Sequence, residues 1–327
     1  NMYLKNFLTN KYFWLLIFFG AYLRLVDYTK DPFYISSSRA VFVDSGIYTF
    51  NAKLYNQTGN FNFDDKEYNY HFIFPIYSGI SALIFKIFGV NYDKFIIINA
   101  IAGIIGAIFL AATANTLKTQ LITLFFYMFY FVLIAFNRSG LMENFVFLWL
   151  AIVLFLYNTN KKLWLVLSGI LSVLGIFLKT NLIVILIALI IHRLISDLFY
   201  IKNEENIIEI KSEKHRFAFW LGIILGFAIS IFFIYYNRDF YKTVNSTIIF
   251  RQIFSEHLET NNLFAFFRRF ITFFDSNLFV RELPLYLLTL YIIFFKINFR
   301  KIEEQQLLLI LIMLLNYFFV LLSDYSP

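Results

Sequence analysis

The sequence predicts an all-α integral membrane protein, a polytopic bundle of about nine spans with interfacial helices in its first extracytoplasmic loop. Of its 327 residues, 60% are hydrophobic and only 15% are charged, and the mean hydropathy is +0.68. Soluble domains carry about 25% charged residues. Apolar runs of near-spanning length alternate with short polar loops, as in a helical bundle whose members each need about 20 residues to cross the hydrocarbon. A transmembrane β-barrel would alternate apolar and polar residues instead.

Charge and cysteine usage narrow the class further. The net charge of +7 indicates membrane topology and no nucleic-acid partner, because the basic residues lie in loops beside apolar runs, where they orient a membrane protein. The absence of cysteine excludes disulfides, thiol catalysis and thiolate metal sites. The four histidines show no ligand spacing, so we predict no histidine metal site.

The first span is predicted over residues 11–27, where Lys5 and the other early lysines favour a cytoplasmic N-terminus. Residues 28–93 then form an extracytoplasmic loop of mixed polarity. Its apolar run at 72–89 is short for a span and contains Pro75, so we predict an interfacial helix that lies along the outer surface.

The next two spans are predicted over residues 95–115 and 120–136, joined by a tight cytoplasmic turn that holds Lys118. Residues 137–144 then lie outside. A fourth span follows, and the basic turn at 158–162 returns the chain to the cytoplasm.

The apolar stretch 163–192 is too long for one ordinary span, so we divide it at Lys179, which is thereby placed outside. The remaining predictions are a charged cytoplasmic loop at 193–216, a span at 217–236, an outer segment at 237–282 with an amphipathic interfacial helix at 263–274, and spans at 283–297 and 306–323.

No internal repeat or low-complexity linker divides the bundle, so we treat residues 1–327 as one domain. The chain begins Asn-Met and stops just after an apolar run. Both ends therefore look like the ends of a segment of a longer chain, and we expect a further C-terminal part beyond Pro327.

This topology gathers unusual polar residues from separate places in the chain at the outer membrane boundary. Ionisable groups near lipid are expensive and tend to be retained for function. Simpler interpretations exist: Asp44 could be a solvated loop aspartate, and Arg138 and Lys179 could be basic residues that extend to the lipid headgroups. The residues are Asp44, His71, Arg138, Glu143 and Lys179.

Four stretches follow one another along the first 180 residues: Asp44-Ser-Gly-Ile-Tyr48-Thr-Phe-Asn-Ala52, Phe74-Pro-Ile-Tyr77, Asn137-Arg-Ser-Gly-Leu-Met-Glu143 and residues 169–179. Together they resemble motifs of the GT-C glycosyltransferases, specifically the branch of the dolichyl-phosphate-mannose protein mannosyltransferases and ArnT-like enzymes. The first resembles the element Asp-Glu-x-x-Tyr-x-x-x-Ala, the second His-Pro-Pro-Leu-Tyr, the third Ser-Arg-x-x-x-x-Asp/Glu, and the fourth a Gly-rich helix that ends in Lys. Three departures are visible: Ser45 replaces the usual second acid, Phe74 replaces the first Pro, and His71 lies earlier than the family's histidine.

The resemblance implies a GT-C-type bundle in the inner (cytoplasmic) membrane of a prokaryote. Its reaction would be the transfer of a sugar from a polyprenyl-phosphate donor to a protein, lipid or glycan acceptor at the extracytoplasmic face. Asp44 is the candidate general base for the acceptor hydroxyl, assisted by Glu143. A divalent cation between these two carboxylates is unsupported, because the chain has no Asp-x-Asp motif.

The substrate-binding candidates are basic and aromatic residues of the same motifs. Arg138 can grip the departing phosphate bidentately, and Lys179 can act on it as a point charge. Tyr48 and His71 are assigned to substrate binding by their places in the motifs.

Two other classes remain open. A secondary transporter or a flippase of lipid-linked sugars would also carry intramembrane charges, although transporters usually show paired repeats and broken helices near the midplane. A polysaccharide polymerase or ligase shares lipid-linked substrates, but it is expected to have its large functional loop late in the bundle. Here the late outer segment is only 237–282.

Overall fold

The computed structural model of the chain is helical wherever it describes regular structure, and no described residue lies in a strand, which confirms the predicted all-α class. Two compact units are distinguished: residues 1–182 with 210–244, and residues 183–209 with 245–327. The structure describes residues 2–26, 39–61, 72–130, 133–134, 137, 142–159, 161–198, 216–238, 308 and 310–312; for residues 2–3, 39–48, 196–198 and 216 it describes the backbone alone.

Two of the described helices are long and apolar enough to cross a membrane. They are α5 (Tyr92–Ala112) and the segment Phe217–Tyr236 of α11 (Arg216–Tyr236). Nine spans stay a prediction, and the predicted segments 263–274 and 283–297, with most of 306–323, lie outside the described residues. Shorter apolar helices lie at Pro75–Phe88 (α4), Leu117–Phe129 (α6), Glu143–Asn158 (α8), Lys162–Phe177, which includes α9 (Lys162–Leu174), and Thr180–Ile195, which includes most of α10 (Ile183–Leu198).

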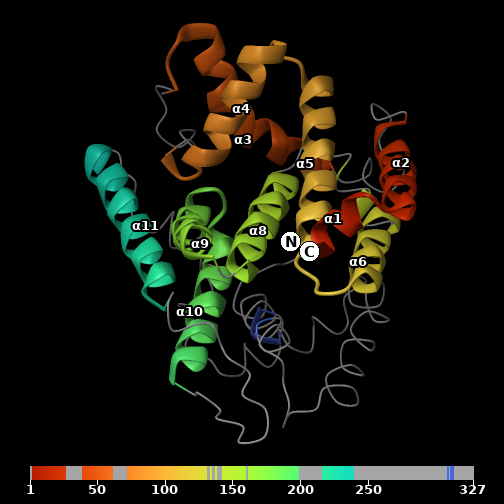
Figure 1. Cartoon of the computed structure of the whole chain (residues 1–327). Helices are drawn as coiled ribbons and strands as arrows, with labels where there is room; N and C mark the ends of the chain where they lie inside the picture. The colour runs from red at the N-terminus through yellow and green to blue at the C-terminus, as the bar shows by residue number, and fades with distance from the viewer. Residues whose placement is uncertain are drawn as a thin grey trace, which may run out of the picture. The chain divides into compact units, whose positions relative to one another are not determined.

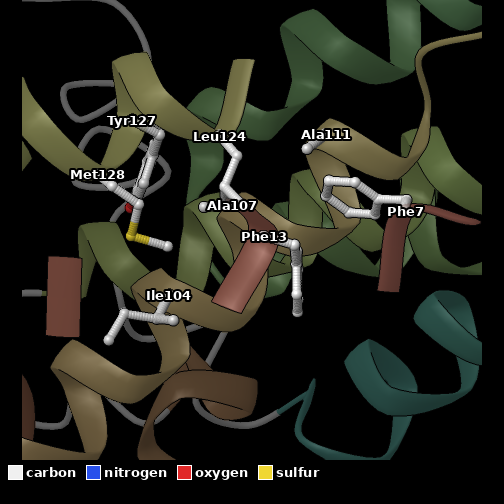
Figure 2. Close-up of a cluster of buried hydrophobic side chains, with 8 residues drawn as sticks. All are labelled: Phe7, Phe13, Ile104, Ala107, Ala111, Leu124, Tyr127 and Met128. Atoms are coloured by element: carbon white, nitrogen blue, oxygen red, sulfur yellow. The ribbon is translucent and has the colours of Figure 1, made fainter. Parts of the chain in front are cut away.

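The first unit begins with α1 (Met2–Leu8), which the sequence analysis did not predict, and α2 (Lys11–Leu25), which matches the predicted helix at 11–27. Asn10 starts α2 as an N-cap, because its side-chain oxygen accepts the Tyr12 N–H at 2.9 Å. Both helices contribute to a buried apolar cluster with α5 and α6, shown in Figure 2. Its members are Phe7, Phe13, Ile104, Ala107, Ala111, Leu124, Tyr127 and Met128.

Helix α5 lies at the centre of this unit and packs against α8 on one side and α6 on another (Figure 1). The turn between α5 and α6 ends at Thr116, whose hydroxyl accepts the Thr119 N–H and caps α6. Helix α6 ends at Phe129, earlier than the span predicted over 120–136, because Tyr130 takes an extended conformation with ψ 115°.

Helix α3 (Arg39–Thr58) carries the first predicted motif and packs against α4, as Figure 1 also shows. The Asn56 amide of α3 donates to the carbonyl oxygen of Ala82 in α4 at 3.0 Å, and the Thr49 hydroxyl lies 2.5 Å from the Tyr92 hydroxyl at the start of α5. With 14 residues, α4 is about 21 Å long, shorter than the hydrocarbon core of about 30 Å. The interfacial position of α4 stays a prediction, because α6, which lies in a predicted span, is shorter still with 13 residues.

The predicted break at Lys179 is confirmed. Helix α9 ends at Leu174 and is followed by two short 3-10 turns, η3 (Gly175–Phe177) and η4 (Thr180–Leu182), with Lys179 between them. Helix α9 itself packs along α11 and α8.

Helices α2 and α11 each present large apolar side chains on an exposed face, where a soluble protein would place polar residues. The packed face of α11 combines small residues, among them Ala218 and Ser230, with two large apolar ones, Phe219 and Ile223, which are 0% and 6% exposed. The exposed set includes Trp14, Leu15, Phe18, Phe19 and Tyr22 on α2, and Phe217, Ile224, Ile231, Phe232, Tyr235 and Tyr236 on α11.

Candidate functional site

The structure joins two of the sequence-predicted site residues in an ion pair. The Lys179 Nζ atom donates to Oε1 of Glu143 at 2.5 Å, although the two residues are 36 positions apart in the chain. The side chains are 20% and 40% exposed, respectively, so the pair lies at the edge of the packed unit, partly open to the surroundings.

Glu143 is held at the N-terminus of α8, where its negative charge is favoured by the unpaired backbone N–H groups of the first turn. Only one carboxylate oxygen meets Lys179. The other, Oε2, is buried and has no hydrogen-bond partner among the described residues. A buried carboxylate oxygen without a partner is costly, so this position is suited to accept a hydrogen bond from a hydroxyl or a cationic group.

Lys179 is positioned by the helix break itself. Its backbone N–H donates to the carbonyl of Gly175 at 3.0 Å, and its own carbonyl accepts the Leu182 N–H at 3.0 Å. Both 3-10 turns are therefore tied to Lys179, and its ammonium projects from a fixed backbone. The indole N–H of Trp149 in α8 donates to the Leu171 carbonyl of α9 at 2.8 Å, which ties the helix that carries Glu143 to the helix that precedes Lys179.

An aromatic cluster supports the first turn of α8. Tyr77, from the Phe-Pro-Ile-Tyr motif of α4, is fully buried, and its ring centroid lies 6.1 Å from that of Phe145 and 6.4 Å from that of Phe95. Phe145 lies two residues after Glu143. The described contacts thus bring the motif at 74–77 next to the end of the motif at 137–143. Helix α4 also contacts η3, which belongs to the motif at 169–179.

A buried polar network adjoins the N-terminus of α8. Arg24 of α2 is fully buried, and its Nε atom donates to the side-chain oxygen of Asn137. The Asn137 amide nitrogen donates in turn to the side-chain oxygen of Asn144, next to Glu143. The sequence analysis named none of these three residues as a site residue, although Asn137 begins one of its motifs. The signal was available in Arg24, a cation inside the apolar run of the first predicted span, where a charge is expensive.

The other predicted site residues are only partly visible. Asp44 and Tyr48 lie on α3, one turn apart on the same row of the helix, and the description of these positions covers the backbone alone. His71 and Arg138 lie outside the described residues. The structure therefore brings Glu143 and Lys179 together, and the roles of Asp44, Tyr48, His71 and Arg138 stay predictions. In the part of the chain that the structure describes, no three acidic or histidine side chains gather as a metal-ligand set.

Comparisons of the chain with models of protein families, with curated proteins and with solved structures find no match. The resemblance carried by the four motifs therefore stays an expectation. The functional argument rests on the residues themselves and on the geometry around Glu143 and Lys179.

Proposed function

We propose that this chain is a membrane glycosyltransferase of the GT-C type, which moves a sugar from a polyprenyl-phosphate donor to an acceptor hydroxyl at the extracytoplasmic face. The observation that carries the proposal is the ion pair between Lys179 and Glu143, 2.5 Å long. It joins residues of two motifs at one end of α8, and it leaves one carboxylate oxygen without a partner among the described residues.

The surface of the helices supports a membrane location; that this is the inner membrane, crossed by several spans, is part of the proposal. Helices α2 and α11 expose rows of large aromatic and aliphatic side chains, and two helices have the length and composition of a span. Such contiguous apolar surface is unfavourable in water and is covered at no cost by lipid chains.

The proposed reaction is a displacement at the anomeric carbon of the donor sugar, with inversion. The acceptor oxygen forms the new bond to this carbon, and the bond from the carbon to the phosphate oxygen breaks. The electron pair leaves with the polyprenyl phosphate. The acceptor proton goes to the Asp44 carboxylate, the general base.

Lys179 and Arg138 stabilise the negative charge that develops on the departing phosphate, because fixed cations in a partly dry site act strongly where charge appears. In the absence of donor, Glu143 holds the Lys179 ammonium in place. The free oxygen Oε2 of Glu143 is suited to orient the acceptor hydroxyl or to bind Arg138.

A transporter or flippase of lipid-linked sugars is the second candidate function, and one observation favours it. The chain carries a charged pair at an interrupted helix, between α9 and η4, and broken helices with charged groups are common at transport sites. The two functions differ in their products, since a transferase consumes the lipid-linked sugar and a flippase only moves it across the bilayer.

Two experiments test the proposal. Mass spectrometry of lipid extracts compares the amount of polyprenyl-phosphate sugar in cells with and without the gene. A second experiment follows the same lipids in liposomes that contain the purified protein. A transferase predicts that a polyprenyl-phosphate sugar accumulates without the gene, and that the purified protein with acceptor releases free polyprenyl phosphate. If the lipid-linked sugar changes leaflet but stays chemically intact, the chain is a flippase. If no such lipid accumulates or reacts, the proposal is wrong.

A further inference from the structure

Arg24 is a buried cation whose hydrogen bonds end on the backbone of α6. Its Nη1 atom donates to the Met128 carbonyl at 2.8 Å, and its Nη2 atom donates to the Tyr127 carbonyl at 2.8 Å. A third bond, from Nη1 to the Gly20 carbonyl at 3.0 Å, stays within α2. The last carbonyls of a helix have no partner inside the helix, and a cation there also meets the negative end of the helix dipole. Arg24 therefore caps the C-terminus of α6.

Asn137 connects this cap to α8. Its side-chain oxygen accepts the Arg24 Nε–H, and its amide nitrogen donates to the Asn144 side-chain oxygen and to the Tyr127 hydroxyl, the latter at 3.3 Å. The Asn144 amide nitrogen also lies 3.5 Å from the backbone carbonyl oxygen of Asn137. The Asn137 side chain also packs against Gly103 of α5. A Cβ atom at Gly103 would lie 2.6 Å from the side-chain nitrogen of Asn137.

All the side chains of this network are buried, with Arg24, Asn137 and Asn144 between 0% and 3% exposed. Buried polar groups keep their geometry because each lost hydrogen bond leaves an unpaired group away from water. Asn144 is the second residue of α8, and Glu143 is the first. The network therefore fixes the helix end from which the Glu143 carboxylate reaches Lys179.

We propose that Arg24 is a positioning residue: through Asn137 and Asn144, it sets the place of the Glu143 carboxylate opposite Lys179. The structural part of this inference stands on the described contacts alone. Its consequence for donor binding rests on the proposed function, because only then does the place of Lys179 decide the affinity for a phosphate.

The test measures the distance between the two positions directly. The chain has no cysteine, so the double variant Glu143→Cys with Lys179→Cys provides a single pair of thiols for a short bifunctional thiol reagent. Into this background we would introduce Arg24→Met and, separately, Asn144→Leu. Each should slow cross-linking, and Asn144→Asp, which keeps the oxygen that accepts from Asn137, should restore it.

Ser168→Ala is the matched control. It removes a buried hydrogen bond from Ser168 to the Val153 carbonyl, 3.1 Å long, in the middle of α8, and leaves the helix N-terminus untouched. Cross-linking at the parent rate in folded Arg24→Met and Asn144→Leu proteins would overturn the inference, as would equal slowing by Ser168→Ala. If Arg24→Met does not fold, Arg24→Lys, which keeps the charge but loses the fork of donors, provides the same test.

A second measurement separates this inference from the proposed function. The affinity for polyprenyl phosphate in detergent micelles is measured for Arg24→Met, Asn144→Leu and Lys179→Met, each in the otherwise unchanged chain. If all three weaken it by about fivefold or more, the usual scale of coupling between sites, both proposals stand. If cross-linking slows while no variant, Lys179→Met included, changes the affinity, the positioning role stands and the proposed function is wrong.

Discussion

Gly222 of α11 lies against Gly169 of α9 so closely that a Cβ atom on Gly222 would be 3.0 Å from the Cα atom of Gly169. A Cβ atom on Gly169 would in turn lie 2.5 Å from the carbonyl oxygen of Phe219. The obstacles are backbone atoms, which cannot move aside as a flexible side chain can. Small residues that let helix backbones approach are typical of packing in membranes, where there is no hydrophobic force between helices.

We therefore predict that Gly222→Ala destabilises the protein, by about 1–3 kcal/mol as for other overpacked cores. The measurement is thermal unfolding in detergent. Gly79→Ala on α4 is the matched control, because a Cβ atom there meets nothing within 4 Å. It should be neutral or stabilising by up to about 1 kcal/mol, since Ala is the better helix former. Equal melting temperatures for the two variants would show that α9 and α11 do not pack this closely.

The second prediction concerns the path of the chain around α4. If α4 lies along the outer surface and α5 crosses the membrane, Gln57→Cys and Val90→Cys should react with an impermeant thiol reagent from the same side. Lys118→Cys, after α5, should react from the opposite side. All three positions are exposed, and the chain has no native cysteine to obscure the labelling. Labelling of Gln57→Cys and Val90→Cys from opposite sides would mean that α4 spans the bilayer.

Much of the helix pattern could be predicted from apolar runs and polar interruptions. The run from Lys11 predicted α2, and the break at Lys179 was visible because a charged residue and two polar ones interrupt an otherwise apolar stretch. The end of α6 could not be predicted, since its sequence stays apolar beyond Phe129. At that end the guanidinium of Arg24, which belongs to α2, donates to the last carbonyls of α6, and such a tertiary contact is not visible in the local sequence.

The candidate site was predicted in part, because its charged residues also stand out at the ends of apolar runs. The predicted topology put Glu143 and Lys179 on the same side of the membrane, and the structure joins them in an ion pair. That they pair directly could not be predicted, because it depends on how α8 packs against α9 and η3. The buried amides of Asn137 and Asn144 look like ordinary loop residues in an Asn-rich sequence, and only packing distinguishes them.

The third prediction is that Glu143 and Lys179 are energetically coupled. A double-mutant cycle with Lys179→Met and Glu143→Gln, read by thermal unfolding, should give a coupling energy of about 0.5–3 kcal/mol, because each single change leaves a partner of the ion pair without its charge. Lys86→Met, an exposed lysine at the end of α4, is the matched control. A coupling energy no larger than that between Lys86→Met and Glu143→Gln would show that the pair does not form in the folded protein.

The last prediction concerns the proposed general base. Asp44→Asn keeps the size of the side chain and its capacity for hydrogen bonds, and it removes the basicity. It should therefore leave folding and donor binding unchanged and slow transfer by roughly 100-fold or more, the scale of a lost general base. Asp93→Asn is the matched control, since Asp93 is an exposed carboxylate in the first turn of α5. Glu143→Gln should cost less than Asp44→Asn if Glu143 only positions other groups. Near-normal transfer by Asp44→Asn, in a preparation that binds polyprenyl phosphate and is active in the parent form, would assign the base to another residue.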